Sequence, residues 1–192
     1  DGSTFDVINP AREDLIAQVA NLSRTDLARA IDGAAIAQKK WAALSAKERS
    51  NILRAWFNLM IENQEDLAKI LTAEMGKPLA EAMGEVVYGA SFVEFFAEEA
   101  KRNYGETIPG HQVDKRITVI KQPIGVAASI TPWNFPNAMI TRKAAPALAA
   151  GCAFVARPSQ LTPFSALALG VLAERAGLPP GILQILPSNN SS

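Results

Sequence analysis

The sequence predicts an α/β protein in which a helical first half precedes half of a doubly wound parallel sheet. Two observations support this prediction. Up to about residue 105, apolar residues recur with the three- and four-residue spacing of helices. After Gly105, short apolar runs alternate with Ala-rich helical segments in the order β-α-β-α-β. Parallel strands joined by right-handed helical crossovers give this alternation, so we expect a sheet with helices on its faces.

Four helices are expected in the first half. The apolar face of the first extends over residues 27–41, and the second begins at a capping box formed by Ser45 and Glu48. The third covers about 64–75 and ends at Gly76, because glycine readily adopts the left-handed conformation that closes a helix. The fourth begins at Pro78 and extends to about Asn103.

Three aromatic residues lie on the fourth helix. Helical spacing alone accounts for Phe92, Phe95 and Phe96, so we interpret them as core residues that make this helix mostly buried.

The second half predicts strands and two loops that follow them. The expected strands are 116–122, 124–130, 152–156 and 182–186, with helices up to Ala150 and over 164–176 between the last three. Ligands of such sheets bind beyond the carboxyl ends of the strands, where helix N-termini favour anionic groups. The loops 131–136 and 157–163 occupy that position and are the candidate site.

Charge and composition exclude several classes of function. The 192 residues include 19 basic and 19 acidic side chains, so no overall field attracts nucleic acid or a membrane surface. We find no long apolar segment and no signal peptide, and expect a soluble, cytoplasmic protein. The single cysteine and single histidine, Cys152 and His111, cannot form a disulfide, nor a zinc site without carboxylates or another chain.

The motif Ile130-Thr131-Pro132-Trp133-Asn134-Phe135-Pro136 resembles the aldehyde dehydrogenase superfamily. The resemblance covers nearly all of residues 5–187, and its supporting segments occur in the family's order. These segments are Ile8-Asn9-Pro10, Glu74-Met75-Gly76-Lys77-Pro78 with Glu81 and Glu85, Gln122-Pro123-Ile124-Gly125-Val126 and Pro146-Ala147-Leu148-Ala149-Ala150-Gly151-Cys152. Ala138-Met139-Ile140-Thr141-Arg142-Lys143, with Phe164-Ser165-Ala166-Leu167-Ala168-Leu169, looks like the succinate-semialdehyde branch.

The resemblance implies an organisation for the chain. Residues 1–105 correspond to the helical part of the cofactor domain, 106–123 to a strand or hairpin of the oligomerisation region, 124–187 to the dinucleotide-binding half and 188–192 to a disordered tail. The family's cysteine nucleophile, its glutamate base and the second half of its sheet have no counterparts here. We therefore expect a truncated chain, inactive alone, whose parent is a dimer or tetramer.

Asn134 matches the family asparagine whose side-chain amide stabilises the oxyanion formed when the nucleophile attacks the aldehyde. A neutral N–H donor suits that role. The alternative is that Asn134 caps the helix that begins near Pro136.

The resemblance also implies a nicotinamide cofactor. Thr131, Pro132 and Trp133 correspond to residues on its nicotinamide side, although Trp133 alone is equally compatible with the core. Arg157 replaces the family's usual lysine at the adenosine ribose. Gln160 is neutral, whereas a glutamate at this position would repel a 2′-phosphate.

These residues, with the hydroxyl of Ser159, favour NADP over NAD. An ordinary exposed surface arginine is the alternative for Arg157.

Arg142 matches the arginine that binds the distal carboxylate of the substrate in the succinate-semialdehyde branch. Lys143 is the competing residue, and both side chains could instead be solvated.

Cys152 begins a buried apolar strand and is interpreted as structural, not as the nucleophile. A non-catalytic nucleotide-binding or assembly fragment, and a dehydrogenase for another aldehyde, remain alternatives.

Overall fold

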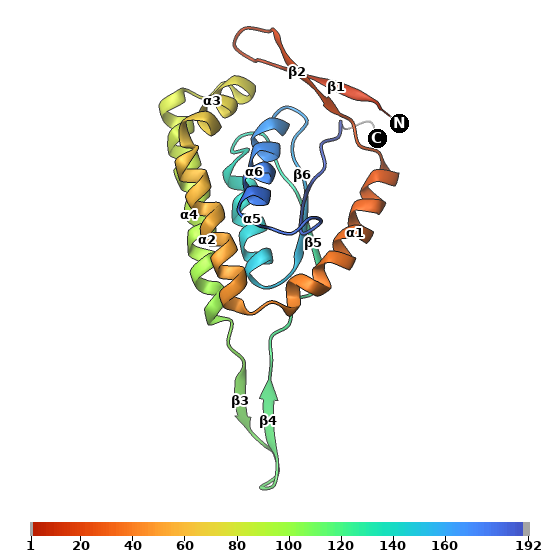
Figure 1. The fold of residues 1–192 in the computed structure, drawn as a ribbon, viewed down its shortest axis with the longest axis vertical. Coiled ribbons are helices and arrows are strands. Elements are labelled where there is room, and N and C mark those ends of the chain that lie inside the picture. The colour runs from red at the N-terminus through yellow and green to blue at the C-terminus, as the bar shows by residue number, and fades with distance from the viewer. Residues whose placement is uncertain (1, 190–192) are drawn as a thin grey trace.

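The computed structural model describes residues 2–189 and has the predicted α/β architecture (Figure 1). The strands are β1 (Thr4–Ile8), β2 (Leu15–Ala20), β3 (Glu106–Pro109), β4 (Arg116–Val119), β5 (Val126–Ile130), β6 (Ala153–Arg157) and β7 (Leu183–Ile185). The helices are α1 (Arg24–Ala43), α2 (Ala46–Glu62), α3 (Gln64–Met75), α4 (Leu79–Glu99), α5 (Ala138–Ala149) and α6 (Pro163–Arg175), and a short 3₁₀ turn (Ala100–Arg102) follows α4.

The central sheet has the order β5-β6-β7, and both strand pairs are parallel. Helix α1 covers one face, and α5 and α6, the two crossovers, cover the other (Figure 1). One edge of β5 has no strand partner among residues 2–189, and Ile130 in this strand is 76% exposed. The apolar strand expected at 124–130 is the shorter β5, because Ile124 lies outside it and is 86% exposed, and one side of this strand lies open.

Helices α2, α3 and α4 form an outer layer against α5 and α6. Two tryptophans, Trp41 of α1 and Trp56 of α2, hold the flanking helices to the crossover helices, because each is buried and donates its indole N–H to a carbonyl oxygen of a crossover helix. Trp41 bonds to Leu148 at 3.0 Å, and Trp56 bonds to Leu169 at 3.2 Å. The rings thus add apolar burial without leaving a polar atom unpaired.

The capping box predicted at the start of α2 and the glycine predicted at the end of α3 are confirmed. The Ser45 hydroxyl accepts from the Glu48 amide, and the Glu48 carboxylate accepts from the Ser45 amide at 2.7 Å. Gly76 closes α3 with a φ of 84°.

The prediction for Phe95 is wrong, because its side chain is 58% exposed. Phe92 and Phe96 are half-buried.

An antiparallel hairpin, β1–β2, precedes the helices and was not predicted. Its turn is held by Asn9, whose side-chain oxygen accepts the amides of Ala11 and Arg12. Val7 and Val19 are its buried residues, at 1% and 6% exposure. The region 1–105 therefore contains this hairpin as well as the expected helices.

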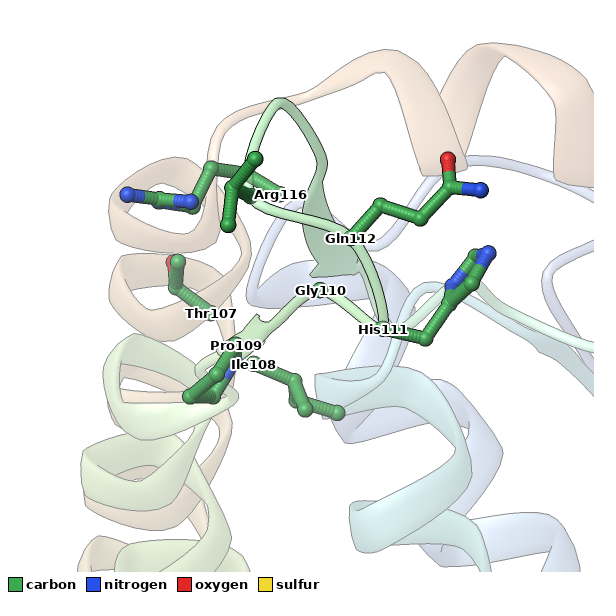
Figure 2. A pocket seen from close by; sticks show the side chains of 8 residues that line it. Thr107, Ile108, Pro109, Gly110, His111, Gln112 and Arg116 are labelled. Carbon is green, nitrogen blue, oxygen red and sulfur yellow. The ribbon is translucent and has the colours of Figure 1, made fainter.

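A second hairpin, β3–β4, extends away from the body at the end opposite β1–β2 (Figure 1). All eight of its strand residues are exposed. The expected strand at 116–122 is thus the shorter β4, paired with β3. Figure 2 shows the hollow of about 630 Å³ at its turn, where His111 and Gln112 point to the side away from Thr107 and Arg116.

Within residues 2–189, no helix is both long and apolar enough to cross a membrane.

Candidate active site

The two candidate loops lie at one edge of the sheet, beyond β5 and β6. Ile130 pairs with Arg157 in the parallel register, and the Thr131 amide continues that register by donating to the Arg157 carbonyl at 3.1 Å. Arg157 is the last residue of β6, not the first of the loop as expected. Thr131 is buried, whereas Pro132, Trp133 and Asn134 are exposed. The loop after β5 therefore presents its middle part to solvent.

The N-terminus of α5 is capped by a carboxylate from another helix. Glu85 of α4 accepts hydrogen bonds through Oε1 from the amides of Asn137, at 2.9 Å, and Ala138, at 3.3 Å. The helix begins at Ala138 with Asn137 in the capping position, and the Asn137 side chain makes no capping bond. The alternative in which Asn134 caps this helix is wrong, because Glu85 supplies the acceptor.

Lys77 lies beside Glu85 at the same helix start. Its Nζ is 2.5 Å from Glu85 Oε2, and the two side chains are only 9% and 1% exposed. The same ammonium donates to the Asn134 carbonyl oxygen at 3.4 Å and stands 3.9 Å from the centre of the Phe135 ring. One buried ion pair therefore contacts several consecutive parts of the loop after β5.

A second buried carboxylate caps α6. Glu74, near the end of α3, accepts the Phe164 amide and the Ser165 amide, both at 2.7 Å. Burial raises the pKa of Glu74 to about 7, although the hydrogen bonds from Ser165 and Phe164 favour the charged form. Within residues 2–189, Glu74 forms no ion pair.

Three of the predicted cofactor residues border two separate hollows. Arg157 and Ile130 line a cleft of about 340 Å³ between the sheet and the start of α1, together with Leu22, Ser23, Arg24, Leu27, Ile31, Ala128, Ser129, Val155, Leu186 and Ser188. We call this the α1 cleft. Trp133 and Gln160 line another hollow of about 280 Å³, next to β1 and Glu74. The structure thus brings these residues to one edge but not into one pocket.

Arg157 is tied to the segment that follows β7. Its Nε donates to the Ser188 hydroxyl at 2.7 Å, and its guanidinium also donates to the carbonyl oxygens of Ser188 and Asn189. The Asn189 amide in turn donates to the Asn21 side chain at 2.9 Å. Residues 188 and 189, expected in a disordered tail, thus form defined contacts; 190–192 lie outside the described residues.

Ser159 shapes the loop after β6, where its hydroxyl accepts the Leu161 amide at 3.2 Å and its carbonyl accepts the Thr162 amide at 3.1 Å.

Arg142 and Lys143 differ in their surroundings. Arg142 is exposed on α5, with its guanidinium 5.4 Å from the centre of the Phe92 ring, and forms no ion pair within the described chain. Lys143 is half-buried and donates to the Met139 carbonyl at 3.1 Å. Burial and the neighbouring Arg142 charge lower the pKa of Lys143. Arg142 is therefore the cation more accessible to an anionic group.

The comparisons with known proteins agree with this architecture. The model of the aldehyde dehydrogenase family matches residues 1–192. The chain belongs to the aldehyde dehydrogenase family. It is 62% identical over 185 residues to a glutarate-semialdehyde dehydrogenase of Pseudomonas aeruginosa, and 61% identical over 185 residues to a succinate-semialdehyde dehydrogenase of Escherichia coli whose name specifies NADP(+). Each match covers 96% of this chain and 38% of the relative, so the chain spans well under half of their length.

A solved aldehyde dehydrogenase from Brucella melitensis has the same fold over this region. The TM-score is 0.97 at 61% identity, covering 98% of this chain and 39% of that one. The expected resemblance, including its limitation to an N-terminal portion of family members, is therefore confirmed.

Glu74, Lys77 and Glu85 lie in the segments that resemble the family, but their roles at the helix starts were not predicted from the sequence. A signal was present, because Glu85 shares a helical face with Ala82 and Gly89, both on the buried side of α4. A glutamate on an apolar helix face is buried when the helix packs, so its carboxylate needs hydrogen-bond or ion-pair partners in the fold. Cys152, in contrast, is buried as predicted.

Proposed function

We propose that this chain is the cofactor-side portion of an NADP-linked aldehyde dehydrogenase that oxidises a semialdehyde with a distal carboxylate, such as succinic semialdehyde. The loop after β5 supports this most directly. Asn134 is exposed in this loop, while the buried side chains of Lys77 and Glu85 hold the loop backbone by hydrogen bonds. Net oxidation consumes the aldehyde, water and NADP⁺ and yields the acid, NADPH and a proton.

Asn134 would donate its amide N–H to the aldehyde oxygen as negative charge develops there. Such a donor acts best when it is fixed in advance, because no reorganisation is then needed in the transition state. Neither the nucleophile nor the base is assigned to this chain. Cys152 is buried immediately before β6, where a nucleophile would not reach the substrate.

The α1 cleft suits one part of a dinucleotide. It combines apolar walls from Leu27 and Ile31 with the Arg157 guanidinium at the carboxyl ends of the strands. From the family resemblance, we assign Arg157, Ser159 and Gln160 to the adenosine end and Thr131, Pro132 and Trp133 to the nicotinamide end, although Gln160 and Trp133 line one hollow and Arg157 lines the other. The bound cofactor would supply hydride acceptance.

Arg142 would bind the distal carboxylate of the substrate. It lies about one turn into α5, the helix whose start orders the Asn134 loop, and its charge is not paired within the described chain. A guanidinium can grip a carboxylate through two hydrogen bonds and so orient the aldehyde end. The names of the two relatives, which specify succinate and glutarate semialdehydes, both fit an anionic substrate.

A chimera tests the activity. Residues 1–187 of this chain replace the matching part of the E. coli relative, and NADPH formation is followed with succinic semialdehyde. Asn134→Ala should lower kcat by about 10²- to 10³-fold, the usual effect of losing one oxyanion donor. Asn58→Ala, an exposed asparagine on α2, is the matched control. Equal activity of the two variants would refute the role of Asn134.

The substrate assignment has its own test in the same chimera. Arg142→Leu should raise KM for succinic semialdehyde at least tenfold and leave KM for butyraldehyde unchanged. Lys143→Leu should affect both aldehydes little. If Arg142→Leu changes KM equally for both substrates, Arg142 does not bind the distal carboxylate.

The cofactor assignment is tested with the 192-residue chain by calorimetry. NADP should bind more tightly than NAD, and Arg157→Leu should remove that preference.

An assembly role is the second candidate, favoured by the exposed β3–β4 hairpin and the open edge of β5. Exposed strand edges promote pairing with other chains. We propose that the parent is a dimer or tetramer, with this hairpin at the contact. Sedimentation of the chain with and without residues 106–123 distinguishes assembly from monomeric behaviour.

A further inference from the structure

The ion pair between Lys77 and Glu85 is unusual in its surroundings. Lys77 lies in the short connection between α3 and α4, and Glu85 lies about two turns into α4. Both side chains are almost completely removed from solvent, at 9% and 1% exposure. Burying two charges costs free energy that a single contact rarely repays, so such a pair needs additional hydrogen bonds. Within the described chain, the side-chain hydrogen bonds that the pair makes beyond its own contact, and its contact with an aromatic ring, all go to residues 134–138.

The contacts of the pair are divided along the loop. Lys77 holds its first part, through the Asn134 carbonyl oxygen and the face of the Phe135 ring. Glu85 holds its last part, through the amides of Asn137 and Ala138. The negative carboxylate also complements the positive end of the α5 dipole, and the ammonium neutralises the carboxylate. None of these contacts uses the Asn134 side chain, which is left for another partner.

The other end of α5 is also fixed from outside. Arg49 donates through Nε to the Ala149 carbonyl at 3.1 Å, and Trp41 donates to the Leu148 carbonyl. The helix therefore cannot slide along its axis without breaking contacts at both ends. The position of the loop depends on the pair at the N-terminal end of this fixed helix.

We propose that Lys77 and Glu85 are positioning residues for Asn134, which they place by fixing its backbone. This inference rests on the proposed function of Asn134. A displacement of about 1 Å in a reacting geometry can cost about 10²-fold in rate. Weakening the pair should therefore lower kcat without a matching change in KM for the cofactor.

The kinetic test is a double-mutant cycle in the chimera. Glu85→Gln should lower kcat about 10- to 100-fold, comparable to the loss of an outer-shell partner at other sites. In the Asn134→Ala background the same substitution should lower kcat less than threefold, because the group it positions is already absent. Additive effects, or an unchanged kcat for Glu85→Gln, would overturn the proposal.

A matched control lies on the same helix. Glu94 also pairs with a cation, Arg54, at 2.7 Å, but it is half-exposed and lies nine residues further along α4, about 13 Å by the rise of the helix. Glu94→Gln should leave kcat within twofold of the parent. If it lowers kcat as much as Glu85→Gln does, general loosening of α4 explains the result and the positioning role fails.

A second measurement is independent of activity. Amide hydrogen exchange in the 192-residue chain should accelerate at least tenfold at residues 137 and 138 in Glu85→Gln, and stay unchanged in Glu94→Gln. If Glu85→Gln does not fold, Lys77→Met combined with Glu85→Leu leaves no buried charge and serves instead. Unchanged exchange at residues 137 and 138 would refute the pair as a positioning device, even if the chimera is inactive. An inactive parent chimera with accelerated exchange would instead refute the proposed function and, with it, the inference about Asn134.

Discussion

The starts of α5 and α6 use the same device in two electrostatic settings. Each crossover helix begins just after a strand of the sheet, and each receives a buried glutamate that accepts two backbone amides. At α5 the carboxylate is paired with Lys77, whereas at α6 Glu74 has no cation within the described chain. The carboxylate that caps a helix can thus be neutralised by a paired cation, or it can stay unpaired and change its protonation with pH. The first arrangement suits a loop that must stay in place, and the second makes its loop dependent on pH.

Removing one member of the paired cap should have the largest effect on stability. Glu85→Leu leaves Lys77 buried without a counter-ion, and breaking such a pair costs about 3–5 kcal/mol. Urea unfolding of the 192-residue chain measures this loss. Adding Lys77→Met should recover most of it, because the buried charge is then gone. If the double variant is as unstable as the single one, packing and not charge determines the cost.

The unpaired cap should make the stability of the chain depend on pH. The pKa of Glu74 is raised from 4.5 to about 7 in the folded state, so the folded chain binds more protons than the unfolded chain between these values. Its contribution is therefore fully present below about pH 4.5 and is lost as the pH rises to about 7. The shift of roughly 2.5 pKa units corresponds to about 3 kcal/mol.

Glu74→Gln removes this titration and supplies the control. The difference in unfolding free energy between the parent chain and this variant, measured at several pH values, should decline over that window. A constant difference from pH 4.5 to pH 8 would contradict the raised pKa.

The contact between α4 and α5 near the paired cap predicts a smaller effect. A Cβ at Gly89 would stand 2.2 Å from the Asn137 side-chain oxygen, closer than any normal contact. Gly89→Ala should therefore destabilise the chain by about 1–3 kcal/mol, as overpacking does, although alanine favours the helix. Thermal unfolding monitored by circular dichroism checks this. Gly84→Ala, at a site on the same helix with open space, should instead be neutral or stabilising.

Interactions close in sequence were predictable, and interactions between distant segments were not. Ser45 and Glu48 form their capping box three residues apart, and Gly76 ends α3 through its own backbone. The order of strands and crossovers likewise follows from local patterns. Glu85, in contrast, meets Asn137 across 52 residues, and no local pattern specifies that meeting.

The candidate site shows the same limit. The motif from Ile130 to Pro136 indicated the loop that carries the candidate site. That Lys77 is buried next to this loop could be recognised only from the folded structure. The prediction for Phe95 failed because helical spacing identifies a face without saying what covers it. The contact of Arg157 with Ser188 likewise depends on where the chain passes after β7.

The smallest expected effect concerns Asn137, whose side chain is buried beside Gly89 although neither of its polar atoms has a hydrogen-bond partner within the described chain. An unsatisfied buried polar group costs about 1–3 kcal/mol, and Asn137→Ala removes both atoms while it keeps the backbone amide that Glu85 accepts. The small cavity left behind offsets part of this gain, so we expect a stabilisation of about 1 kcal/mol.

Asn137→Ala should also reverse the effect of Gly89→Ala on the free energy of unfolding, from destabilising to stabilising. Without the Asn137 oxygen, the nearest remaining atoms to the new Cβ are Thr141 Oγ1 at 3.3 Å and the Ala138 Cα at 3.4 Å, which small shifts can accommodate. The helix propensity of alanine then dominates, and Gly89→Ala should stabilise the Asn137→Ala chain by a few tenths of a kcal/mol. Urea unfolding of the four chains in this cycle decides the matter. A destabilising Gly89→Ala in both backgrounds would mean that α4 and α5 are too closely packed here for any added methyl group, so that Asn137 is not the cause.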